Sequence, residues 1–134
     1  MRHPQLLVWE SDGRLASCLE ATAKSKKWLL RRPRRLDSCL AFLGRSGPAA
    51  VALKIGRDLQ RELTLLEQVC WFFPETAVVV VCDTDDPGLV GLAWDLGASY
   101  VLSAPWTPHE LTDIVTSILD QRNSGHCNDR VASS

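Results

Sequence analysis

Ala77-Val-Val-Val-Val-Cys82, followed at once by Asp-Thr-Asp-Asp-Pro-Gly at 83–88, is the stretch that decides the fold. The first six residues are apolar throughout, and the run is too short to be a helix of its own. A short apolar run rich in β-branched residues is typical of a strand that is buried on both faces, as in a parallel sheet. The sequence therefore predicts a central strand over residues 77–82.

A helix is expected directly after this strand. Asp85 and Asp86 can cap its first turn, and Pro87 suits the first helical position, where the missing N–H needs no partner. Gly97 predicts the end of the helix, and the apolar residues 100–104 predict another buried strand. The expected inner face of the helix carries Leu89, Leu92, Ala93 and Leu96. The sequence therefore predicts one strand–helix–strand unit over residues 77–104.

The rest of the chain extends this unit into five strands that alternate with five helices. Three further strands are expected at residues 5–10, 28–31 and 48–55, and three further helices after Asp12, Asp37 and Asp58. The helix after Asp37 should end at Gly44 and bury Leu40, Ala41 and Leu43, and the helix after Asp58 should bury Leu59, Leu63, Leu66, Cys70 and Phe73. The last helix begins with a capping box, Thr107-Pro108-His109-Glu110, and buries Leu111, Ile114, Val115 and Ile118.

The second strand is flanked by the charged and proline-containing segment Arg32-Pro33-Arg34-Arg35, which belongs at the edge of a sheet. With short right-handed connections, an edge position for this strand gives a doubly wound, five-stranded parallel sheet of order 2-1-3-4-5. The α/β class and this order are the predicted fold.

A chain of 134 residues with 46% apolar residues has the size and composition of one domain. We expect this domain at residues 1–122 and a disordered tail at 123–134, which lacks any hydrophobic period. No apolar run is long enough to span a membrane, and the N-terminus has no signal-peptide core. The five scattered cysteines form no metal-binding spacing, so we expect reduced thiols, a cytoplasmic location and no metal. The eight glycines are dispersed and form no phosphate-binding loop, so we expect no cofactor.

Three segments carry a resemblance to a known family: the Asp85-Asp86 helix start, Leu-Gly-Ala at 96–98, and Ser-Ala-Pro-Trp-Thr-Pro-His-Glu-Leu at 103–111. Over residues 5–120 the chain resembles the receiver domains of bacterial two-component response regulators. The last segment is similar to the Lys-Pro-Phe region that leads into the final helix of those domains. The resemblance implies a flavodoxin-like (CheY-like) fold.

The resemblance also implies positions for the receiver chemistry. Receivers hold a magnesium ion with two acidic residues after the first strand and accept a phosphoryl group on an aspartate that ends the third. A hydroxyl residue ends the fourth strand, and a lysine precedes the proline after the fifth. The matching residues here are Glu10, Ser11, Lys54, Cys82 and Ala104, and only Glu10 is preserved in kind. The degenerate pocket at these strand ends is completed by Asp12, Asp83 and Ser103.

This pattern predicts a degenerate receiver (a pseudo-receiver) that binds a protein without being phosphorylated, in bacterial signal transduction or regulation, and that is not an enzyme. Two alternatives stay open. One is an active atypical phosphoacceptor receiver that uses Asp12 or Asp58, and the other is a small flavodoxin-like ligand-binding protein. In the degenerate pocket, we expect Glu10 and Lys54 to form an ion pair.

Two surfaces are candidates for partner binding. Trp94, Tyr100 and Trp106 lie in the last helix–strand–helix face, and exposed aromatic residues are typical anchors for a protein partner or for self-association. The basic patch Arg31, Arg32, Arg34 and Arg35 could instead meet nucleic acid or another acidic partner. We favour the aromatic face, because edge protection already explains the arginines. We expect no membrane association.

Overall fold

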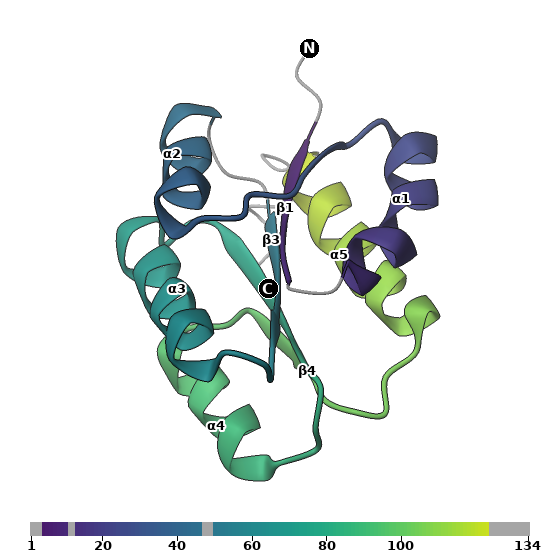
Figure 1. The fold of residues 1–134 in the computed structure, drawn as a ribbon. Coiled ribbons are helices and arrows are strands. Elements are labelled where there is room, and N and C mark those ends of the chain that lie inside the picture. The colour runs from purple at the N-terminus through teal and green to yellow at the C-terminus, as the bar shows by residue number, and fades with distance from the viewer. Residues whose placement is uncertain (1–3, 11–12, 47–49, 124–134) are drawn as a thin grey trace, which may run out of the picture.

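The computed structural model describes residues 4–10, 13–46 and 50–123. Its five parallel strands lie in the order β2-β1-β3-β4-β5, which confirms the predicted doubly wound topology (Figure 1). The elements in chain order are β1 (Gln5–Trp9), α1 (Arg14–Lys26), β2 (Leu29–Arg31), α2 (Leu36–Ser46), β3 (Ala50–Ile55), α3 (Leu59–Phe72), β4 (Ala77–Cys82), α4 (Pro87–Leu96), β5 (Tyr100–Leu102) and α5 (Pro108–Asn123).

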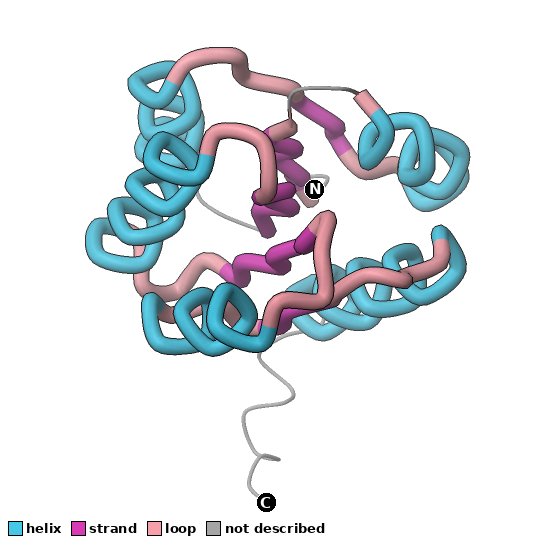
Figure 2. Tube along the Cα trace, turned by 60° about the horizontal axis from the view of Figure 1, so that its bottom comes forward, coloured by secondary structure: helices cyan, strands magenta, loops and turns pink. Residues whose placement is uncertain are grey.

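Helices cover both faces of the sheet (Figure 2). Alternate residues of β1 show the two layers: Leu6 and Val8 pack in the cluster under α1 and α5, whereas Leu7 and Trp9 pack in the cluster under α2, α3 and α4. Every residue of β3 and β4 is buried. The apolar runs of these strands are therefore explained by packing on both sides of the sheet.

The predicted helix signals of the central unit are confirmed. The Asp86 side chain caps α4 by accepting a hydrogen bond from the Gly88 N–H at 2.9 Å, and Gly97 ends the helix in a left-handed conformation. The capping box of α5 is also formed: the Thr107 N–H donates to the Glu110 carboxylate at 2.9 Å, and the Glu110 N–H donates to the Thr107 hydroxyl at 3.1 Å.

Three predicted apolar faces are wrong in detail. In α3 the buried residues are Glu62, Leu65, Leu66 and Val69, whereas Leu59 is exposed. In α2, Cys39 is buried instead of Ala41, and the helix continues past Gly44 to Ser46; in α4, Leu92 is exposed. The spacing gives a helical period, but the direction in which the sheet meets each helix sets which residues face inward.

None of the helices in the described ranges is long and apolar enough to cross a membrane. The tail was predicted at 123–134, but Asn123 is the last residue of α5; residues 124–134 and the expected start of β3 at residues 48 and 49 lie outside the described residues.

Gly97 sets the distance between α3 and α4. Its φ is +116°, and a Cβ added there would lie 2.9 Å from both the Cβ and the Sγ of Cys70. We therefore expect Gly97→Ala to lower the free energy of unfolding by more than about 1 kcal/mol, because it adds both backbone strain and a clash.

Gly91 is the matched control in the same helix, because a Cβ there would meet nothing within 4 Å. Gly91→Ala should raise stability by about 0.5–1 kcal/mol through helix propensity. Urea denaturation of both variants checks the pair, and equal effects would contradict the close α3–α4 packing.

Candidate functional site

The carboxyl ends of the parallel strands lie along one side of the sheet, which we call the carboxyl edge to distinguish it from the edge strands β2 and β5. The strand register places Trp9 beside Leu53 and Ile55 beside Cys82, so the residues at the ends of β1, β3 and β4 are neighbours. Lys54, Cys82 and Asp83 gather here, as predicted from the strand order. Ser11 and Asp12 lie outside the described residues.

An ion pair joins the ends of β3 and β4. The Lys54 ammonium lies 3.2 Å from a carboxylate oxygen of Asp83, and the two side chains are 5% and 32% exposed. The Asp83 N–H also donates to the Ile55 carbonyl at 3.1 Å, which fixes the backbone that carries the carboxylate. A nearly buried ammonium thus occupies the position that the receiver resemblance assigns to the phosphoacceptor.

The expected partner of Lys54 was Glu10, but the carboxylate of Glu10 is used elsewhere. Its two oxygens accept hydrogen bonds from the Leu15 N–H at 2.6 Å and the Ala16 N–H at 2.9 Å. These amides belong to the first turn of α1, whose N–H groups have no partner within the helix. Glu10 therefore stabilises the start of α1, and Asp83 provides the counter-charge for Lys54.

Cys82 and Ala104 do not supply the groups that the matching receiver positions hold. Burial, with the carboxylates of Asp83 and Asp86 as further causes, raises the pKa of the Cys82 thiol to about 11. The thiol therefore stays protonated at neutral pH and is a poor nucleophile. The Ala104 N–H donates to the Thr84 carbonyl at 3.3 Å, which ties the segment after β5 to the loop after β4, and Ser103 beside it is half-buried.

Sequence reasoning missed two residues of this edge, Gly56 and Glu62. Glu62 is buried, and its carboxylate accepts a hydrogen bond from the Gly56 N–H at 2.9 Å. A Cβ on Gly56, whose φ is +143°, would lie 2.9 Å from the Cβ of Asp83. Glycine at this position therefore allows the close approach of Asp83 to β3. The available signals were a glycine just after a predicted strand and a carboxylate in the first turn of the next helix.

The described residues at this edge do not fit a magnesium ion. Magnesium requires several hard oxygen ligands in octahedral geometry. Here the Glu10 oxygens bind backbone amides, and the Asp83 carboxylate is paired with an ammonium. Within the described ranges, no three His, Cys, Asp or Glu side chains cluster as a metal site.

Solved structures share this architecture. A response regulator from Thermotoga maritima superposes with a TM-score of 0.74, at 20% identity over 89% of this chain and 99% of its own. The chain has the fold of a response-regulator receiver domain. A CheY-like receiver domain protein from Methanospirillum hungatei gives 0.75, at 14% identity over 92% and 98% of the two chains. The receiver domain of NtrX from Brucella abortus gives 0.71, at 23% identity over 86% and 98%. No family model and no curated protein matches the sequence.

The receiver fold places the predicted aromatic residues in two different environments. Trp94 and Tyr100 are 46% and 42% exposed, and their rings form an edge-to-face pair with centroids 6.0 Å apart. Trp106 is instead partly buried against the cluster under α1 and α5. Sequence reasoning missed Trp71 and Phe72 at the end of α3, which are 77% and 61% exposed.

The predicted basic patch divides into two pairs. Arg31 donates to the Gln5 side chain at 3.3 Å and lies over the Phe42 ring, and Arg35 forms an ion pair with Asp37 at 3.2 Å. Arg32 and Arg34 line a pocket at the end of β1. Half of the patch therefore has local contacts within the fold.

Removing either partner of the Lys54–Asp83 ion pair should lower stability, but by different amounts. Asp83→Asn should destabilise by about 1–3 kcal/mol, because it removes a counter-charge from a nearly buried ammonium. Lys54→Met should cost less, because the Asp83 carboxylate is partly exposed and can be solvated. Urea denaturation measures both effects.

The double variant Lys54→Met/Asp83→Asn should be close in stability to Lys54→Met, since the ammonium that the Asp83 carboxylate stabilises is gone. The proposed coupling between Lys54 and Asp83 would be contradicted if the two losses in the free energy of unfolding were additive, or if Lys54→Met lost more than Asp83→Asn.

Proposed function

We propose that this protein is a degenerate receiver domain, a protein-binding module of bacterial signal transduction or regulation that works without phosphorylation and without enzymatic activity. One observation carries the proposal: the nearly buried Lys54 ammonium, paired with Asp83, stands at the acceptor position. An ammonium group cannot form the acyl phosphate that an aspartate forms.

The same ion pair supports a single conformation of the edge. It links β3 to the loop that leads from β4 into α4, a loop also held by hydrogen bonds to Ile55 and Ala104. In an active receiver, the phosphoryl group would have to change the contacts between the end of β3 and the loop from β4 to α4. The Lys54–Asp83 ion pair offers no phosphoacceptor for such a step, so we expect α4 to be presented to a partner in one arrangement.

The surface proposed for a protein partner is the Trp94–Tyr100 pair on α4 and β5. Trp71 and Asp95 line a shallow groove beside Leu96, between the ends of α3 and α4, which extends this surface. The carboxylates of Glu67 and Asp95 border the groove. A protein segment with apolar and basic side chains fits this combination of exposed aromatic rings and negative charge.

Phosphorylation is tested directly by mass. After incubation with acetyl phosphate and magnesium, the intact mass of the protein should be unchanged, whereas a conventional receiver domain in the same tube gains one phosphate. Beryllofluoride with magnesium should likewise leave the tryptophan fluorescence unchanged. A gain of one phosphate that hydroxylamine removes would show an acyl phosphate and overturn the proposal.

The aromatic surface is tested by affinity capture and by self-association. Trp94→Ala should weaken partner binding or self-association by more than about 1 kcal/mol, because an exposed aromatic anchor is lost. Phe72→Ala is the control, since it removes another exposed ring from outside the Trp94–Tyr100 pair. Sedimentation equilibrium reports self-association, and quantitative capture from a lysate of the source organism reports partners.

We expect Trp94→Ala to lose the partner binding or self-association that the parent protein shows, and Phe72→Ala to retain it. Circular dichroism should show both variants folded. Binding that survives Trp94→Ala but disappears when Arg31, Arg32, Arg34 and Arg35 are changed to alanine would identify the basic patch as the partner surface instead.

A further inference from the structure

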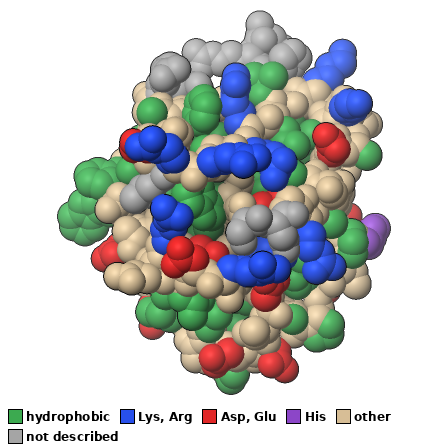
Figure 3. Space-filling view, in the orientation of Figure 1, with side chains coloured by type: hydrophobic (Ala, Val, Ile, Leu, Met, Phe, Trp, Pro, Cys, Tyr) green, Lys and Arg blue, Asp and Glu red, His purple; other side chains and the backbone are tan. Residues whose placement is uncertain are grey.

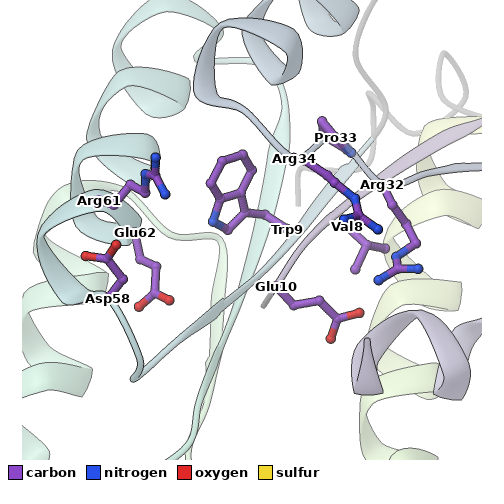
Figure 4. A pocket seen from close by; sticks show the side chains of 9 residues that line it. All are labelled: Val8, Trp9, Glu10, Arg32, Pro33, Arg34, Asp58, Arg61 and Glu62. Carbon is purple, nitrogen blue, oxygen red and sulfur yellow. The ribbon is translucent and has the colours of Figure 1, made fainter. Parts of the chain in front are cut away.

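A pocket of about 270 Å³ opens beside the degenerate site, between the end of β1 and the start of α3. Its lining includes Trp9 at the end of β1, Glu10 just after it, the segment Arg32-Pro33-Arg34 before α2, and Asp58, Arg61 and Glu62 at the start of α3 (Figure 4). Lys54, Cys82 and Asp83 are not part of this lining, so the pocket lies beside the acceptor position, although Glu10 belongs both to this lining and to the predicted degenerate site.

Three arginines from two separate segments surround this pocket. Figure 4 shows Trp9 between Arg61 on α3 and Arg34 in the segment before α2. Within the described part of the chain, none of Arg32, Arg34 and Arg61 forms an ion pair. The surface view shows many Lys and Arg side chains across the upper and middle part of this face, with Asp and Glu side chains among them (Figure 3).

The backbone between Arg32 and Arg34 is restrained before any ligand binds. Pro33 is buried, whereas Arg32 and Arg34 on either side of it are exposed. The proline ring restricts φ, so the segment loses little freedom when a ligand binds. The buried Pro33 therefore fixes the backbone from which the exposed Arg32 and Arg34 side chains extend at the pocket wall.

Two of the three carboxylates in the pocket wall are already engaged. Glu10 binds two amides of α1, and Glu62 is buried and binds the Gly56 amide. Asp58 is the exposed N-cap residue of α3, and its side chain makes no capping hydrogen bond. The available hydrogen-bonding groups at the mouth of the pocket are therefore mainly guanidinium donors.

We propose that this pocket binds the phosphate group of a small phosphorylated organic molecule. Guanidinium groups match the oxygens of a phosphate through paired N–H donors. The volume exceeds what an inorganic ion alone would fill, and the indole of Trp9, buried in the pocket wall, offers an apolar surface to the organic part. This ligand site goes beyond the protein-binding function proposed above and does not depend on it.

The test is calorimetric titration of the full chain with ribose 5-phosphate, inorganic phosphate and ribose at low salt. Ribose 5-phosphate should bind more tightly than inorganic phosphate, and neutral ribose should not bind. Arg34→Gln and Arg61→Gln should each weaken binding of the phosphorylated sugar about tenfold, the loss expected for a charged hydrogen-bonding group. Asp58→Asn removes a negative charge from the pocket wall and loses no capping hydrogen bond, because the Asp58 side chain makes none, so it should tighten binding.

Arg35→Gln is the matched control, because Arg35 lies next to the pocket segment but is paired with Asp37. It should leave the affinity unchanged. The proposal is overturned if ribose 5-phosphate does not bind, if it binds no better than inorganic phosphate, or if Arg35→Gln weakens binding as much as Arg34→Gln. Trp94→Ala should not alter this binding, which separates failure here from failure of the aromatic partner surface.

Discussion

A strand buried on both faces can bring polar side chains to solvent only where it ends, and this constraint governs the molecule. β3 and β4 are covered by helices on both sides, so the chemistry of the sheet is concentrated at the edge where Lys54, Cys82 and Asp83 lie. Lys54 is the penultimate residue of β3 and is itself nearly buried. Its ammonium therefore requires a nearby negative charge.

The position of that charge determines how the edge is built. Asp83, the first residue beyond β4, approaches β3 closely because Gly56 has no Cβ to block it. Glu10 is then left to bind the amides at the start of α1. The strand ends at this edge thus carry an ammonium paired with the Asp83 carboxylate, and a second carboxylate, Glu10, that binds the amides at the start of α1.

The two proposed binding regions lie near different ends of the sheet. The arginine-lined pocket is at the carboxyl end of β1, whereas the groove beside Trp71 is lined by Thr76 and Ser99, which precede β4 and β5. A small phosphorylated ligand and a protein partner would therefore contact separate surfaces. The buried strands between them form a packed core that both regions share.

The sequence by itself determined the strand–helix alternation, the sheet order, the caps of α4 and α5, and the location of Lys54 at a strand end. These features follow from local patterns: buried apolar runs, prolines and glycines at fixed positions, and a charged edge strand. Tertiary structure decided the partners. Sequence spacing does not say whether Lys54 meets Glu10 or Asp83, which face of α3 turns inward, or that Arg61 joins Arg32 and Arg34. Those outcomes depend on how helices pack against a sheet and on which charges then lie within a few ångströms of each other.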